Sequence, residues 1–204
     1  MESPRVKKLL LWLPLIAVAA APLVVADALE NVYKAPEFVF TIPGKGEQLL
    51  SQYRGKVVAL EFIFTTCPHC QAASRMMTRF QSEYGPRGLQ VIDVAVNQNA
   101  DLMVENFARE FQVNFPVGWA TAEQMQKFMG FDPSGRYVVP QLVLLDRKGF
   151  VHWRTPAVED EKWDTLMKEE NIREHIEELL QQPHAAAAHR SPGTTKLESG
   201  KKPS

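Results

Sequence analysis

One stretch of the chain constrains the fold more than any other. Residues 57–64, which read Val-Val-Ala-Leu-Glu-Phe-Ile-Phe, are apolar with a single exception. An apolar run of this length without alternation is expected for a strand buried on both faces, as in the parallel sheets of α/β proteins. The exception is Glu61, and acids are rarely buried without a partner. The stretch therefore predicts a central strand that carries a carboxyl group.

The elements around this strand predict a three-layer α/β fold, with a central mixed β-sheet flanked by helices. Helical spacing of apolar residues after Pro68 continues until Gly85-Pro86 stops it, and a second apolar strand follows over residues 89–96. A turn that ends in Gly149 joins two apolar runs, which is a hairpin signal. The other expected elements are strands over residues 38–40, 115–117, 141–145 and 150–154, and helices over 101–111, 121–129 and 161–181.

The length of the chain is sufficient for one domain of ordinary size and too short for two. It has 204 residues, of which 45% are hydrophobic and 23% charged, as in globular proteins. The formal net charge of −1 gives no basic surface for nucleic acid. We expect one domain over residues 29–181, followed by a disordered tail over 182–204 that is rich in Pro, Ala, Ser, Gly, Thr and Lys.

The N-terminus has the pattern of an export segment. A basic cluster that ends at Lys8 precedes an uncharged apolar run from Leu9 to Ala26. Small residues at Ala26 and Ala28 suit cleavage, while the run is also about long enough to span a bilayer. Residues 1–28 are therefore expected to be a signal peptide or an N-terminal membrane anchor. Either interpretation predicts a periplasmic or extracytoplasmic domain, where disulfides persist.

The protein has two cysteines, and they stand in the sequence Cys67-Pro68-His69-Cys70. A structural disulfide closing so short a loop would constrain little of the unfolded chain, so we favour chemistry. Cys67 directly precedes Pro68 at the expected helix start, where unpaired N–H groups and the helix dipole stabilise an anionic sulfur. Cys70 lies one turn later and can resolve a mixed disulfide. His69 between them is expected to act on the thiolate as well.

These residues, with the strand before them, resemble the thioredoxin superfamily over roughly residues 35–181. The pair between the cysteines is the one found in DsbA-like oxidases, and Pro140 after Val139 stands where the family has a cis-proline facing the cysteines. Glu61, six positions before Cys67, matches the family's buried acid. The resemblance implies that Glu61 relays a proton and that Val139 and Pro140 bind substrate. The alternative for Glu61 is a merely tolerated acid at a strand edge, and without the resemblance an ordinary trans bond would be expected before Pro140.

The layout as a whole is more similar to the anchored TlpA/ResA-like and redoxin group than to DsbA. The signs are an N-terminal hairpin region, an inserted segment over about residues 97–131 and Leu145-Asp146-Arg147-Lys148-Gly149 near the end. That group commonly acts as a reductant, whereas the Pro68-His69 pair favours an oxidant, so the direction stays open. The resemblance implies a protein thiol–disulfide oxidoreductase with dithiol or disulfide protein substrates and a redox partner protein, which could be a membrane protein. No cofactor is expected.

Three kinds of alternative compete with thiol–disulfide exchange: a zinc or haem site, peroxide reduction and copper binding. A zinc site needs four ligands and only His69 is near, while Gln71 after Cys70 excludes c-type haem attachment. A peroxiredoxin-like peroxide reductase would have Thr three positions before the cysteine, where this chain has Phe64. A copper-binding assembly module is the third alternative. Its candidate ligands, Met76, Met77, Met125 and Met129, are more typical of core residues.

Overall fold

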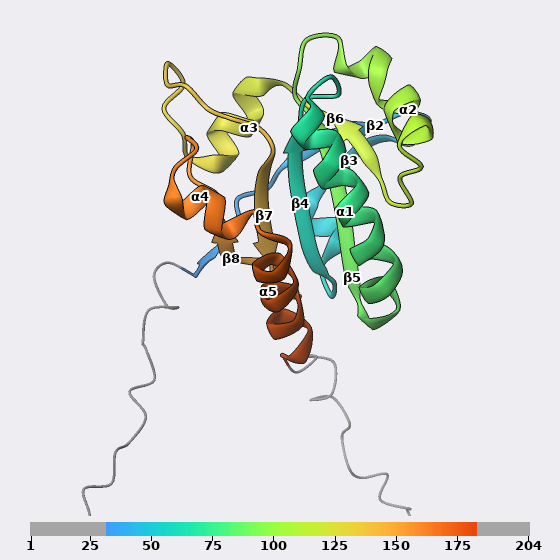
Figure 1. The fold of residues 1–204 in the computed structure, drawn as a ribbon. Coiled ribbons are helices and arrows are strands. Elements are labelled where there is room, and N and C mark those ends of the chain that lie inside the picture. Colours follow the sequence, from blue (N-terminus) through green and yellow to red (C-terminus); the bar gives the residue numbers. More distant parts are fainter. Residues whose placement is uncertain (1–31, 183–204) are drawn as a thin grey trace, which may run out of the picture. The chain divides into compact units, whose positions relative to one another are not determined.

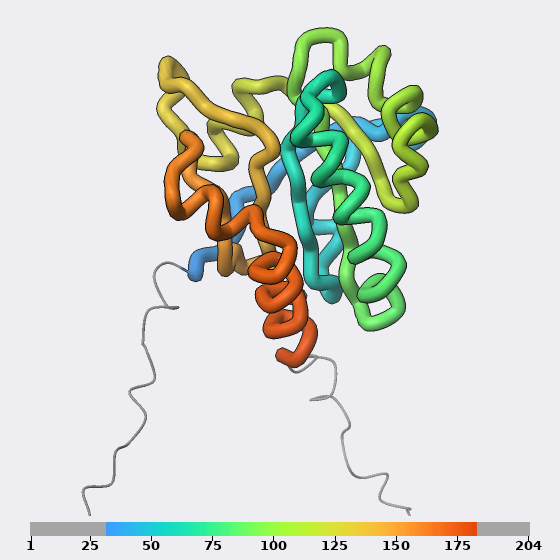
Figure 2. The backbone as a smooth tube through the Cα atoms, viewed as in Figure 1, coloured from blue at the N-terminus to red at the C-terminus, as the bar shows by residue number. Residues whose placement is uncertain are grey.

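The computed structural model describes residues 32–182 (Figures 1 and 2). The predicted export segment, residues 1–28, lies outside the described residues, as does the predicted tail from residue 183 onward. Between residues 32 and 182, no helix has the length and apolar composition that crossing a membrane would require.

The described chain is built around one mixed sheet, as predicted. Its strand order is β1-β8-β7-β4-β5-β6-β2-β3. The central strand β4 pairs in parallel with β5 on one side and antiparallel with β7 on the other, and every residue of β4 is buried. The strands are β1 (Tyr33–Lys34), β2 (Val39–Ile42), β3 (Gly46–Leu49), β4 (Val57–Ile63), β5 (Leu89–Ala95), β6 (Val117–Trp119), β7 (Gln141–Leu145) and β8 (Phe150–Arg154).

Helices cover both faces of the sheet and give two separate cores. Helices α1 (Pro68–Tyr84) and α5 (Glu169–Gln181) lie on one face (Figure 1), and α2 (Ala100–Glu110) adds to the same core. The core on the other face of the sheet contains residues of helix α3 (Ala122–Met129) and of β2. Successive residues of β4 alternate between the two cores, because side chains of a strand point to opposite faces. This alternation directs Glu61 toward the α1 side.

The N-terminal hairpin region expected from the sequence is present. β2 and β3 pair antiparallel through a turn in which Gly44 adopts a φ of +73°, and β2 ends at Ile42, just before the stop expected at residue 43. The short strand expected over 115–117 begins instead at Val117 and runs to Trp119. Its middle residue, Gly118, lies so close to β2 that a Cβ would stand 2.7 Å from the Thr41 carbonyl oxygen. Glycine therefore permits β2 to pair with β6 here.

The single helix expected over residues 161–181 is two helices, α4 (Glu161–Leu166) and α5. Neither proline nor glycine stands at the break. Tertiary contacts explain it: the Trp163 indole N–H donates to the Pro140 carbonyl oxygen at 3.3 Å, and the Asn171 amide donates to the Thr165 carbonyl at 2.6 Å. The first contact holds α4 beside the Pro140 loop, and the second satisfies an open carbonyl where α4 ends.

The methionines considered as copper ligands are core residues. Met77 is fully buried on the α1 side of the sheet, whereas Met125 and Met129 are buried in the core on the opposite side. Met76 packs at the margin of the first core. A sheet thus separates the members of the set, and they do not form one site.

Candidate active site

The start of α1 places Cys67 at the surface and fixes its backbone. Cys67 is the N-cap residue with an extended backbone, and Pro68 occupies the first turn of the helix. The Cys67 N–H donates to the Phe64 carbonyl at 3.1 Å, and the Cys67 carbonyl accepts from the Gln71 N–H at 3.0 Å. The side chain of Cys67 is half-buried, while Pro68 and His69 are exposed. The helix N-terminus therefore adjoins an accessible sulfur.

The segment that contains Pro140 faces this sulfur. The Val139–Pro140 peptide bond is cis, as the resemblance implied, and the Val139 carbonyl oxygen lies 3.9 Å from Cys67 Sγ. Val139 is half-buried and Pro140 is buried. The backbone of Val139 thus forms one wall beside the proposed nucleophile. The loop is held from behind by Trp163, which sequence reasoning missed.

Cys70 is enclosed although it lies only one turn from Cys67. Its side chain is 0% exposed, and its sulfur accepts a hydrogen bond from the Phe64 N–H at 3.4 Å. Burial raises the pKa of the Cys70 thiol far above its usual value, and the neighbouring Cys67 and Glu61 act in the same direction. The two cysteines are free thiols. Cys70 is therefore a protonated thiol that needs a base before it can attack.

Glu61 supplies a carboxyl group beneath Cys70, but it does not lie there alone. The parallel register of β4 and β5 sets Glu61 opposite Asp93, and both residues are 0% exposed. Burial raises the pKa of Glu61 well above its usual value, and the neighbouring Asp93 raises it further. Burial also raises the pKa of Asp93 to about 7, although its hydrogen bond from Ser74 opposes this shift. The site thus contains two buried acids where the sequence suggested one.

An open groove is lined by Thr66 and Gln71, which stand on either side of the Cys67–Cys70 segment in the sequence. It has a volume of about 570 Å³ and lies between the active-site loop and α2. Thr65 is fixed at its floor by hydrogen bonds to the Asn97 side chain, of 2.9 Å from its N–H and 3.3 Å from its hydroxyl. Leu102, on the rim, is 79% exposed. The other lining residues are Met103, Asn106, Phe107, Glu110 and Phe111.

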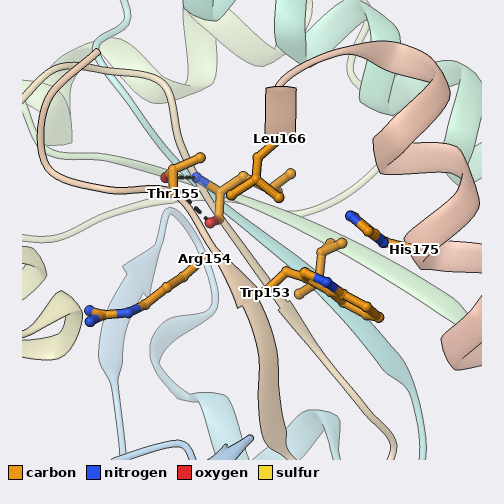
Figure 3. A pocket seen from close by; sticks show the side chains of 7 residues that line it. Trp153, Arg154, Thr155, Leu166 and His175 are labelled. Atoms are coloured by element: carbon orange, nitrogen blue, oxygen red, sulfur yellow. Dashed lines mark hydrogen bonds between the residues drawn. The ribbon is translucent and has the colours of Figure 1, made fainter. Parts of the chain in front are cut away.

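A second, much smaller cavity lies behind β7 and β8 and is structural (Figure 3). Its volume of about 10 Å³ holds roughly one water molecule. Trp153, a sheet residue as predicted together with His152, stacks on His175 of α5 with ring centroids 4.1 Å apart. Burial lowers the pKa of His175. The imidazole of His175, kept neutral by burial and stacked on Trp153, therefore packs α5 against the sheet beside this cavity.

The residues predicted for the site come together, whereas Asp93 and Ser74, like Trp163, were not predicted. Cys67, Cys70, Glu61 and Val139 surround one point at the N-terminal end of α1. Asp93 was visible as the one acid inside the apolar strand 89–96, the same signal that Glu61 gave. Ser74 follows Cys70 at helical i+4 spacing, which places both on one face of α1.

Comparisons with known proteins agree with this geometry. The sequence profile of the AhpC/TSA family matches residues 33–154. Thiol-disulfide oxidoreductase ResA from Geobacillus kaustophilus is 30% identical over 145 residues, which are 71% of this chain and 75% of that protein. ResA from Geobacillus thermodenitrificans is 29% identical over the same shares of the two chains.

Solved structures give the same fold. A Chlorobium tepidum crystal structure assigned to the thiol:disulfide interchange protein DsbE has a TM-score of 0.59 and 26% identity, covering 74% of this chain and 99% of that one. A second Chlorobium tepidum structure, of a thioredoxin family protein, has a TM-score of 0.59 at 21% identity, with 74% and 98% covered. The fold is thioredoxin-like, as the resemblance implied.

Proposed function

The chain belongs to the AhpC/TSA family, and from this premise we propose a thiol–disulfide oxidoreductase of the ResA type that exchanges disulfides with protein substrates outside the cytoplasm. The observation that carries the proposal is the asymmetry of the two sulfurs. Cys67 is accessible at a helix N-terminus, whereas Cys70 is enclosed behind it. Such a pair can form a mixed disulfide at one sulfur and release it with the other.

In the oxidising direction, a client thiolate attacks Cys67 Sγ of the Cys67–Cys70 disulfide. The bond between the two enzyme sulfurs breaks, a bond between the client sulfur and Cys67 forms, and Cys70 leaves as a thiolate that takes a proton from Glu61. A second client thiolate then releases the client as a disulfide and leaves Cys67 reduced. The reducing direction runs these steps backwards, with Glu61 as the base that accepts the Cys70 proton.

The client segment has two neighbours beside Cys67. On one side the half-buried Val139 offers its backbone edge, which can pair with an extended segment. On the other side lies the groove beside α2, whose rim exposes Leu102. We assign the groove to apolar client residues near the reacting cysteine, because Leu102, Met103 and Phe107 line it together and burial of their apolar surface would favour a complex.

Trapping tests the assignment of the two sulfurs. Cys70→Ser should accumulate mixed disulfides with clients through Cys67, because no second enzyme thiol can release them. The matched variant Cys67→Ser should accumulate none, because its remaining thiol is enclosed. Non-reducing gels after acid quenching measure both. Adducts that form through Cys70 alone would reverse the roles, and an absence of adducts in both variants would contradict the proposed function.

Location and partners form the second part of the proposal. The basic cluster and apolar run of residues 1–28 support export, with the catalytic domain over residues 29–181. Fusion of a reporter enzyme that is active only outside the cytoplasm, after residue 182, tests this part. An inactive fusion with intact expression would contradict it. A redox partner protein is also proposed, since turnover requires the Cys67–Cys70 pair to be returned to its starting state.

A further inference from the structure

Asp93 is a buried acid to which the exchange steps above give no role. Paired positions on neighbouring strands project to the same face, so Asp93 on β5 lies in the same layer as Glu61 on β4. Both are 0% exposed, and burying two acids side by side is unfavourable unless they share a proton or gain partners. An apolar residue at either position would remove this cost, so packing alone does not account for the two acids.

Ser74 distinguishes the two acids from each other. Its hydroxyl donates to Asp93 Oδ2 at 2.6 Å, whereas neither carboxyl oxygen of Glu61 has a hydrogen-bond partner among the described residues. A hydrogen bond that is donated to a carboxylate favours the ionised form. The negative charge of the pair is therefore held on Asp93, and the proton is held on Glu61. Because Glu61 has no partner at ordinary hydrogen-bond distance, we attribute the influence of Asp93 on it first to charge.

Within residues 32–182, neither acid forms an ion pair with a lysine, arginine or histidine. The causes that raise the pKa of Glu61 are burial and Asp93, and neither is a cation. The titratable group that faces the pair from α1 is Cys70, with Cys67 beyond it. On the neighbouring strands, Leu142 stands opposite Glu61 and Val117 stands opposite Asp93, and both are apolar. The core on this face also contains Met77 of α1 and Ile172 and Ile176 of α5.

We propose that Asp93, held by Ser74, is a positioning residue that keeps the proton of a shared pair on Glu61, ready for Cys70. The inference rests on the proposed function and adds a second acid to it. When a client thiolate attacks Cys67, the proton moves from the Glu61 carboxyl to Cys70 Sγ. The negative charge that the client thiolate brought to the site then lies on the Glu61 carboxylate, beside Asp93. Because two adjacent carboxylates repel, the pair then takes up one proton, which restores the starting state in the oxidising direction.

The test is the titration of Glu61 in Asp93→Asn. We would follow the carboxyl ¹³C signal of glutamate-labelled, reduced protein from pH 4 to 10, and identify Glu61 by the signal that Glu61→Gln lacks. Removing the neighbouring charge should lower the titration midpoint of Glu61 by about one pH unit or more. Ser74→Ala should shift it in the same direction, because Asp93 then competes better for the proton. Ser82→Ala, the same change at an exposed site on α1, should leave it unchanged.

Exchange kinetics give the functional readout. The rate at which the oxidised enzyme reacts with a client dithiol should fall about tenfold in Asp93→Asn for each pH unit above the lowered midpoint. A merely structural role would not move the pH profile. An unchanged Glu61 midpoint in Asp93→Asn overturns the inference, whatever the exchange assay gives. Failure of the proposed function is seen separately, as the absence of trapped client in Cys70→Ser.

Discussion

The buried carboxyl of Glu61 makes the stability of the fold depend on pH, in a direction opposite to that of a salt-bridged acid. Burial and Asp93 raise the pKa of Glu61 above the value of 4.5 that it has in the unfolded chain. The folded protein therefore keeps a proton that the unfolded chain loses above this pH. Stability from this group is complete below about pH 4.5 and is lost as the pH rises toward the folded pKa.

The expected magnitude follows from the one proton that is taken up on folding. One proton corresponds to about 1.4 kcal/mol of unfolding free energy per pH unit. The contribution of Glu61 to the unfolding free energy should therefore fall by ~3 kcal/mol between about pH 5 and 7. Glu61→Gln should remove this part of the slope. A further slope from Asp93, whose pKa burial raises to about 7, should remain. The slope is compared rather than the absolute stability, because a buried amide has a cost of its own of about 1–3 kcal/mol.

Urea unfolding at half-unit steps from pH 5 to 7.5, with both cysteines kept reduced, measures the slopes. Glu105→Gln makes the same chemical change at an exposed position of α2 and should follow the wild type. If the curves for the wild type and Glu61→Gln run parallel from pH 5 to 7, Glu61 takes up no proton on folding. The reasoning about the buried acid would then be refuted.

Two further predictions concern direction and client binding. His69→Ala should lower the reduction potential of the Cys67–Cys70 pair, measured against glutathione, because His69 and the helix N-terminus stabilise the reduced thiolate form. The wild-type potential should lie above the value of about −270 mV typical of thioredoxin, and a value at or below it would favour a reductant. Leu102→Asp should slow mixed-disulfide formation with client proteins severalfold and leave the rate with glutathione unchanged. Val32→Asp, at a residue that is 40% exposed, is the control, and an equal loss there would contradict the groove assignment.

The core of the site could be predicted because its residues lie close in sequence. β4 and the start of α1 are separated by four residues, so strand alternation and helix periodicity suffice to place Glu61, Cys67 and Cys70 together. The helix start follows from Pro68, and the strand follows from its apolar run. The cis bond before Pro140 came from the resemblance alone, since about 5–6% of such bonds are cis.

The parts that could not be predicted depend on contacts distant in sequence. Asp93 was recognisable as an acid in a strand, but its pairing with Glu61 depends on the register of β4 and β5, which neither strand fixes alone. The break between α4 and α5 has the same origin. Residues 167 and 168 are Met and Lys, which are compatible with a continuous helix, and the break accompanies the contacts of Trp163 with Pro140 and of Asn171 with Thr165.

The enclosure of Cys70 separates two kinds of thiol in one small motif. Oxidants and thiols that diffuse freely encounter Cys67, whereas the sulfur of Cys70 is within reach of its own partner only. In the reducing direction of the proposed exchange, a client held on Cys67 is therefore released from inside the protein, by the movement of one proton and of the Cys70 sulfur. This release step depends on the packing around Cys70, whereas the formation of the adduct depends on what can reach Cys67.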